Sequence, residues 1–143
     1  MAFEVSVFLE NKIAHLERIT NILKSEQINI RSLNLLNMMH GWGILNLLVD
    51  KPDRAYQVLA DLGNSVTLHE VIALEMKDES GALDELLVKV SKAGIHIKNA
   101  YTRLIAENGM AIIVLDVPDV LEAQRLLAQN NIPVLDDKIV YGI

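Results

Sequence analysis

The feature that most constrains the fold is an internal repeat, because the second half of the chain reproduces the apolar pattern of the first half. Positions sixty-seven residues apart match through the first part of each half, as Val5 does with Ile72. The spacing is sixty-six residues at one pair of prolines and sixty-eight beyond it. Shifts of this size at loops are what a duplication predicts, so we expect two domains, residues 1–68 and residues 69–143.

Both halves predict the element order β-α-β-β-α-β. Alternating or continuous apolar runs predict strands, and apolar residues three or four positions apart predict helices. In the first half we expect strands at 3–9, 28–36, 44–49 and 66–68, and helices at 16–23 and 50–62. In the second half we expect strands at 71–76, 95–105, 110–115 and 132–135, the last with or without 139–141, and helices at 83–90 and from Pro118 onward. Two closely spaced glycines at residues 40–43 and an Asn-Gly sequence within residues 107–109 predict the two hairpin turns.

This order defines an α+β fold made of two ferredoxin-like βαββαβ units. In such a unit four antiparallel strands form a sheet and two helices cover one of its faces. A unit of about 70 residues is marginal alone, because a small domain buries a small fraction of its surface. Almost no linker separates the copies near His69, so we expect them to be held close together.

Composition excludes several functions. The net charge is −6, and the acidic residues gather in the second half, where 12 face 7 basic residues. No basic stripe that could neutralise phosphates is present, so neither nucleic acid nor an anionic membrane is an expected partner. The chain has no cysteine and no phosphate-binding loop, and its four histidines lack the spacing of metal ligands. We therefore expect no metal, no cofactor and no enzyme activity, and a cytoplasmic protein without a signal peptide or membrane span.

Two short motifs occur in register in both halves. The loop after the first strand reads NKIAHL at residues 11–16 and DESGAL at residues 78–83. The start of the second strand reads QINI at residues 27–30 and AGIHI at residues 93–97. Placed in a βαββαβ pattern, these motifs resemble those of the tandem ACT-domain proteins, and the resemblance covers nearly the whole chain.

The resemblance implies a regulatory protein. ACT domains typically bind an amino acid or a related small ligand between two copies, which commonly pair side by side. It therefore implies an amino acid ligand, a homodimer and a partner enzyme encoded elsewhere. Carried over by motif, the implied ligand-binding residues come from the loop after each first strand and the start of each second strand: Asn11, Ile13, Ala14, His15, Asn29, Ile30, Asp78, Ser80, Gly81, Ala82, His96 and Ile97.

Departures from the family motif leave alternatives open. The first copy has Ile13 and Ala14 where the family has proline and glycine, and the second has Ser80 for proline and Asp78 for asparagine. One copy could bind ligand while the other is structural, or both sites could have decayed in a structural or interaction subunit. Asn11 could contact a ligand or cap the first helix. The aspartates on either side of Pro52 are expected to cap the second helix.

Overall fold

The computed structural model describes residues 1–105 and 108–143. Its contacts divide the chain into two compact units. The first unit comprises Phe3–His69 and Tyr141–Ile143, and the second comprises Glu70–Val140 and Met1–Ala2. The division into folding domains after residue 68 stays a prediction, whereas the α+β class with ferredoxin-like units is confirmed.

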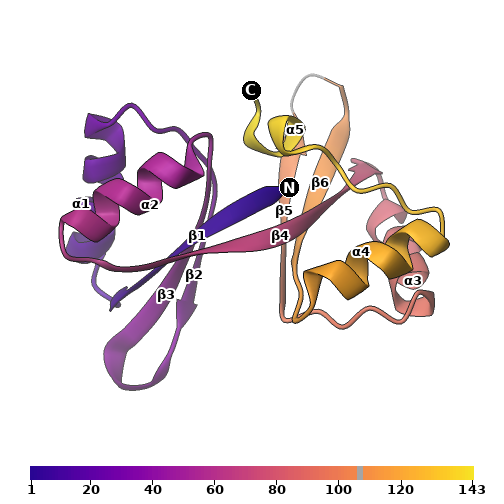
Figure 1. Cartoon of the computed structure of the whole chain (residues 1–143), viewed down its shortest axis with the longest axis horizontal. Helices are drawn as coiled ribbons and strands as arrows, with labels where there is room; N and C mark the ends of the chain where they lie inside the picture. The colour runs from indigo at the N-terminus through magenta and orange to yellow at the C-terminus, as the bar shows by residue number, and fades with distance from the viewer. Residues whose placement is uncertain (106–107) are drawn as a thin grey trace. The chain divides into compact units, whose positions relative to one another are not determined.

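The first unit has the complete ferredoxin-like layout (Figure 1). Its strands are hydrogen-bonded in the order β2-β3-β1-β4. The elements are β1 (Ala2–Glu10), α1 (Ile13–Ser25), β2 (Ile30–Asn37), the 3-10 turn η1 (Met39–Gly41), β3 (Trp42–Val49), α2 (Pro52–Asp61) and the start of β4 (Ser65–Lys77).

Alternation along β1 explains where the core of the first unit lies. Val5, Val7 and Leu9 are buried together with Ile19 and Leu23 of α1. Because successive strand residues point to opposite faces, every second residue of β1 meets the helices. Both helices therefore cover one face of the sheet, as the sequence predicts.

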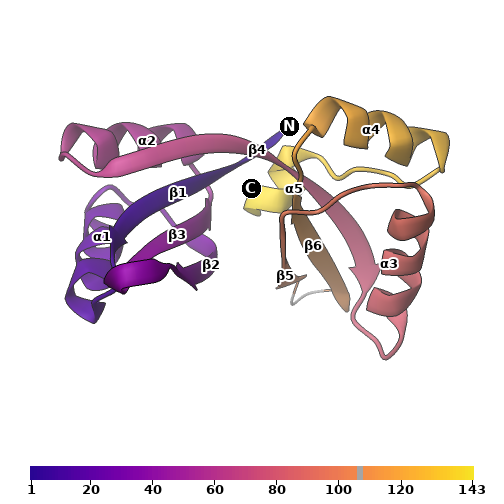
Figure 2. The same ribbon diagram turned by 90° about the horizontal axis from the view of Figure 1, so that it is seen from below.

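The second unit repeats this layout with a different ending. Its strand order is β4-β6-β5, and its core joins the strands to one face of α3 and α4. The elements are the remainder of β4, α3 (Ala82–Lys92), β5 (Asn99–Ile105), β6 (Met110–Asp116), α4 (Val120–Gln129) and α5 (Asp137–Tyr141). Figure 2 shows α5 on the opposite side of β5 and β6 from α3.

The prediction of a last strand in the second half is wrong. Residues 132–136 form no strand, and 139–141 belong to helix α5. The segment makes one backbone hydrogen bond to β4, from Leu135 N to Ala73 O at 2.9 Å. Pro133 lies in the middle of the expected strand and has no N–H to donate, which explains why no ladder forms there.

Other boundaries also differ from those expected, including the start of β2 at Ile30 instead of Ile28. The strands expected at 66–68 and 71–76 are one continuous strand, β4, because the polar pair between them stays extended. β5 begins only at Asn99, so residues 95–98 are not strand. Helix α4 begins at Val120 instead of Pro118, after Asp119, whose side chain accepts a hydrogen bond from Glu122 N. Glu107 of the second expected hairpin turn lies outside the described residues.

Candidate ligand site

The loop after β1 is fixed by the hairpin beside it. Asn11 N donates to Gly41 O at 2.7 Å, and Asn11 Nδ2 donates to Asn37 Oδ1 on the edge strand β2 at 3.2 Å. Helix α1 begins at Ile13 after Lys12, and no side chain caps it. The capping role considered for Asn11 is therefore wrong, and ligand contact stays a prediction for this exposed amide.

Gly43 of β3 makes room for Asn11. A Cβ on this glycine would lie 3.1 Å from Leu36 O, 3.2 Å from Leu35 Cδ1 and 3.7 Å from Asn11 Cβ. Sequence reasoning missed both Gly43 and Asn37 as neighbours of the loop. A glycine inside a strand is the signal that could have found this close approach.

The charges around this first loop favour an anion. Ile13, Ala14 and His15 form the first turn of α1, which has no acidic residue. Lys12 Nζ lies 3.0 Å from Glu10 Oε2, and this hydrogen bond, followed by the ammonium charge, lowers the pKa of Glu10. The free N–H groups and the dipole at a helix start attract a carboxylate.

The loop after β4 is anchored in the same way but is acidic. Asp78 N donates to Gly109 O at 2.9 Å, as Asn11 does to Gly41. Gly81 has φ +86°, a left-handed conformation that favours glycine, and it precedes Ala82, the first residue of α3. Asp84 and Glu85 occupy the first turn of α3, so this helix start is neutralised and repels a carboxylate.

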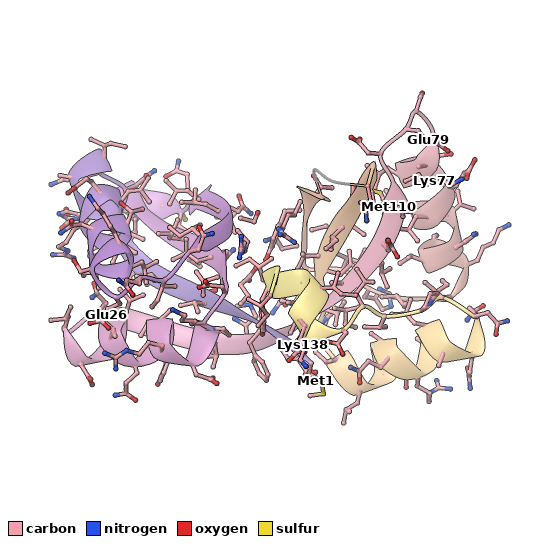
Figure 3. The ribbon with its side chains drawn as sticks, turned by 90° about the horizontal axis from the view of Figure 1, so that it is seen from above. Met1, Glu26, Lys77, Glu79, Met110 and Lys138 are labelled. Atoms are coloured by element: carbon pink, nitrogen blue, oxygen red, sulfur yellow. The ribbon has the colours of Figure 1, made fainter. Side chains whose placement is uncertain are left out.

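A mixed-charge hollow of about 240 Å³ adjoins the second loop. Lys77 and Glu79 flank it beyond the end of β4, with Met110 at the same end of the unit (Figure 3). The hollow is lined by Glu75, Met76, Lys77, Glu79, Ala82, Glu85, Leu86 and Lys89. Of the predicted site residues only Ala82 lines it; Ser80 is exposed in the loop.

Hydrogen bonds hold the segment that precedes β2. Asn29 N donates to Asp50 Oδ1 at 2.9 Å, and Asp50 N donates to Asn29 O at 3.1 Å. Asp50 thus ties down this segment; α2 follows Lys51 and has no side-chain cap, so the predicted capping by Asp50 and Asp53 is wrong. Ile30 opens β2 opposite Val49. In the second unit the corresponding His96 and Ile97 lie in an exposed loop before β5.

Within one unit the two groups of predicted site residues lie at opposite ends of the sheet. Asn11 follows Glu10, which pairs with Trp42, whereas Ile30 pairs with Val49 at the other end of β3. Seven residues of strand separate these points, a distance of about 23 Å. In the second unit Asp78 follows Lys77 opposite Met110, and His96 precedes β5, which begins opposite Asp116. A single amino acid cannot touch both groups of one unit.

The described residues also bear on metal binding and membrane insertion. In residues 1–105 and 108–143, no three metal-ligating side chains come together. No helix in that part of the chain is long and apolar enough to cross a membrane.

The two units, with equivalent loops after β1 and β4, place the chain in the class of α+β proteins built on the ferredoxin-like fold. The sequence matches the ACT domain pair family over residues 1–142, and the chain belongs to that family. A comparison with curated protein sequences finds no match.

Solved structures share this fold. Protein BT0572 from Bacteroides thetaiotaomicron is 29% identical, with a TM-score of 0.86 over 99% of this chain and 96% of that one. The regulatory subunit of aspartate kinase from Thermus thermophilus, in its ligand-free form, is 10% identical with a TM-score of 0.62, covering 90% and 91% of the two chains. The aspartokinase alpha and beta subunits are 13% identical with a TM-score of 0.58 and coverages of 90% and 91%. At such low identity the two kinase structures show the fold alone.

Proposed function

We propose that this protein binds an amino acid or a related small metabolite and signals to a separate partner enzyme through the packing of its ACT units. The proposal rests first on membership of the ACT domain pair family. The regulatory subunit of aspartate kinase from Thermus thermophilus has a similar fold. We therefore propose that a partner enzyme receives the signal of ligand binding. A homodimer and a cytoplasmic location are parts of the same proposal.

One observation carries the coupling between ligand and packing. The loop residue Asn11 and the strand residue Asn29 lie at opposite ends of their sheet, as Asp78 and His96 do in theirs. A complete site then needs the loop of one chain and the strand start of a second chain in the proposed homodimer. A ligand bound there stabilises one packing arrangement over others, which is the differential affinity that regulation requires.

The first test is a thermal-shift screen of the full chain with the common amino acids. A ligand at 100 times its dissociation constant adds about 2.7 kcal/mol of stability, which raises Tm by several degrees. We expect at least one amino acid to do so and to change the sedimentation behaviour of the protein at the same concentration. A set of flat melting curves would contradict the proposal.

A second candidate function is a structural or interaction subunit whose ligand sites have decayed. It is favoured by Ile13 and Ala14, which replace the proline and glycine of the family loop and begin α1 two residues earlier than the equivalent start of α3. Such a subunit would associate with its partner equally well with and without metabolites. A pull-down repeated across amino acid concentrations separates the two functions.

A further inference from the structure

The second unit contains an apolar hollow that lies away from the two ligand loops. It has a volume of about 90 Å³ and lies between the first half of α4 and the loop that leads from α3 to β5. The surface that lines it is almost entirely apolar. Its walls are Gly94, Ile95, His96, Pro118, Asp119, Glu122, Ala123 and Leu126.

In the first unit side-chain contacts join the corresponding elements. Arg54, the third residue of α2, donates from Nη2 and Nε to Glu26 Oε2 at 2.7 and 3.1 Å, and Glu26 is the residue that ends α1. Lys51 Nζ donates to Gln27 O at 3.0 Å. We call these contacts the staple, because they tie the start of α2 to the loop before β2.

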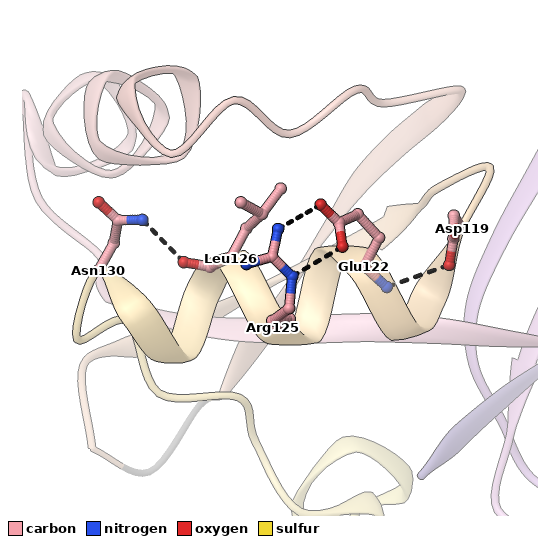
Figure 4. A network of polar contacts seen from close by, with 5 residues as sticks. All are labelled: Asp119, Glu122, Arg125, Leu126 and Asn130. Atoms are coloured by element: carbon pink, nitrogen blue, oxygen red, sulfur yellow. Dashed lines mark hydrogen bonds and ion pairs between the residues drawn. The ribbon is translucent and has the colours of Figure 1, made fainter.

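The second unit has lost both ends of the staple. The third residue of α4 is Glu122, and the residue that ends α3 is Ala93. Figure 4 shows that Glu122 turns along its own helix, where Arg125 donates to its two oxygens at 2.8 and 2.5 Å. Among the described residues no side-chain hydrogen bond joins α4 to residues 94–96, and the hollow lies between them although Ile95 packs against the core of this unit.

Further differences between the copies make the open loop suitable for recognition. Residues 95–97 have no regular structure, whereas the corresponding Ile30 already pairs in a sheet. A second hollow of about 390 Å³ continues past Gly94 and His96 to Leu87, Ser91 and Ile97. The two hollows share Gly94, Ile95 and His96, so the loop is accessible from both sides.

The chemistry of the hollow selects a short aliphatic group. At about 90 Å³ the hollow is much smaller than a pocket for a drug-sized ligand, so it suits a group of a few carbons. Two acidic residues, Asp119 and Glu122, are among its walls, and because Glu122 is paired with Arg125, Asp119 is the one that can attract an ammonium. Of the eight lining residues only His96 carries a side-chain N–H that can bind a carboxylate.

We propose that this hollow is the side-chain pocket of the second unit for an amino acid with a short, branched aliphatic side chain. The aliphatic group lies against Ile95, Ala123 and Leu126, and the ammonium faces Asp119. This proposal rests on the proposed function, that the chain binds an amino acid, and adds the ligand class and the walls supplied by α4. In the first unit the staple joins the equivalent elements instead.

The test is a two-dimensional amide NMR titration of the full chain with three probes: L-leucine, 3-methyl-1-butanol and L-serine. We expect L-leucine and the alcohol to shift the amides of Gly94, Ile95 and Ala123 in a saturable way, because both carry the same branched group. L-serine at the same concentrations should leave these three amides unmoved.

Two variants on α4 form a matched pair. Leu126→Phe fills the hollow from its wall, and we expect it to weaken L-leucine binding by about tenfold or more, as a filled apolar pocket does. Leu121→Phe adds the same bulk at a position that is 76% exposed and away from the hollow, and binding should be unchanged. If Leu126→Phe does not fold, Leu126→Ala removes the same wall of the hollow and should also weaken L-leucine binding.

The outcomes separate this proposal from the proposed function. Leucine shifts confined to the loops near Asn11 or Gly81 would overturn the hollow and leave amino acid binding intact. The hollow is also overturned if Leu126→Phe binds L-leucine as tightly as the wild type, or if only the alcohol binds. Should L-leucine fail while another amino acid raises Tm, the ligand class is wrong and the proposed function stands. Failure of every amino acid overturns both.

Discussion

The two copies share a layout and differ in the chemistry placed on it. In both, the backbone after the first strand is anchored to a hairpin glycine, Gly41 in one unit and Gly109 in the other. In the first unit one ion pair, Arg54–Glu26, holds the loop between α1 and β2, and α1 begins without an acidic residue. The second unit keeps its loop glycine, starts α3 with two acids and leaves a hollow open. The two copies therefore share backbone contacts, while the side chains of the candidate site differ.

The largest expected effect compares the two cores at matched positions. Leu23 of α1 and Val90 of α3 are both buried, and they correspond in the repeat. Leu23→Ala should lower the free energy of unfolding by about 2–5 kcal/mol, and Val90→Ala by about 1.5–3 kcal/mol, because fewer methyl groups are lost. Denaturant unfolding measures both.

Strand β4 decides how these losses should appear. It runs without a break from Ser65 to Lys77 and contributes to both units, so we expect one cooperative transition. Trp42 fluorescence reports the first unit, and circular dichroism reports the whole chain. Leu23→Ala should move both curves together. If it splits them into two transitions, the copies fold independently and the comparison is between two separate domains.

The next largest effect compares two glycines that are required for different reasons. Gly43→Ala crowds Leu35 and the backbone of Leu36, and it should cost about 1–3 kcal/mol. Gly81→Ala meets no atom within 4 Å, but its φ of +86° is strained for alanine, at about 1–2 kcal/mol. Thermal unfolding measures both losses.

Side-chain amide resonances distinguish the steric cause at Gly43 from the backbone strain at Gly81. Gly43→Ala should also shift the side-chain amide resonances of Asn11 and Asn37, because the added Cβ occupies the space beside Asn11. Gly81→Ala should leave those resonances in place. Equal effects of both substitutions on Asn11 would show that Gly43 has no special relation to the first loop.

A smaller effect comes from the staple. The Arg54–Glu26 pair is partly exposed, with side-chain exposures of 55% and 33%, so Arg54→Ala should cost only about 0.2–1 kcal/mol. Its local effect should be clearer: the amides of Gln27 and Ile28 should exchange with solvent faster when the staple is removed. Arg125→Ala is the matched control, since that arginine pairs within its own helix. If amide exchange is unchanged in Arg54→Ala, the staple does not stabilise this loop and is not a difference between the copies.

The sequence predicted the element order because apolar periodicity depends on neighbours within a few residues. It failed where one residue or a long-range pairing decides the outcome. Pro133 removed the donor that the last strand needed, and the polar residues His69 and Glu70 looked like a boundary although the strand continues through them. Local propensity cannot show whether an edge segment finds a partner.

The candidate site was predictable to a lesser degree. The two loops were located from their motifs, but the neighbours Asn37 and Gly43 depend on the register of three strands. The difference between the staple and the hollow depends on which direction Arg54 and Glu122 turn, and both are ordinary charged helix residues in the sequence. Recognition of such contrasts needs the two copies superimposed in space.

The smallest expected effect concerns pH and treats the copies alike. In each unit an exposed carboxyl has a pKa below its ordinary value of 4.5: Glu10 through its hydrogen bond with Lys12, and Glu122 through its hydrogen bonds with Arg125. A carboxyl whose pKa is lowered in the folded state contributes stability above its unfolded pKa and loses it as the pH falls through the folded pKa. The contribution therefore disappears below about pH 4.5 and is small, because both pairs are exposed and screened.

Carboxyl NMR titration can measure the two shifts separately. Arg125→Gln should return the pKa of Glu122 toward 4.5 and leave Glu10 unchanged, and Lys12→Gln should do the reverse. High salt should reduce both shifts, since exposed charges are screened. If Arg125→Gln moved the Glu10 carboxyl, the two units would be coupled electrostatically, and the copies could no longer be compared as separate chemical environments on one duplicated backbone.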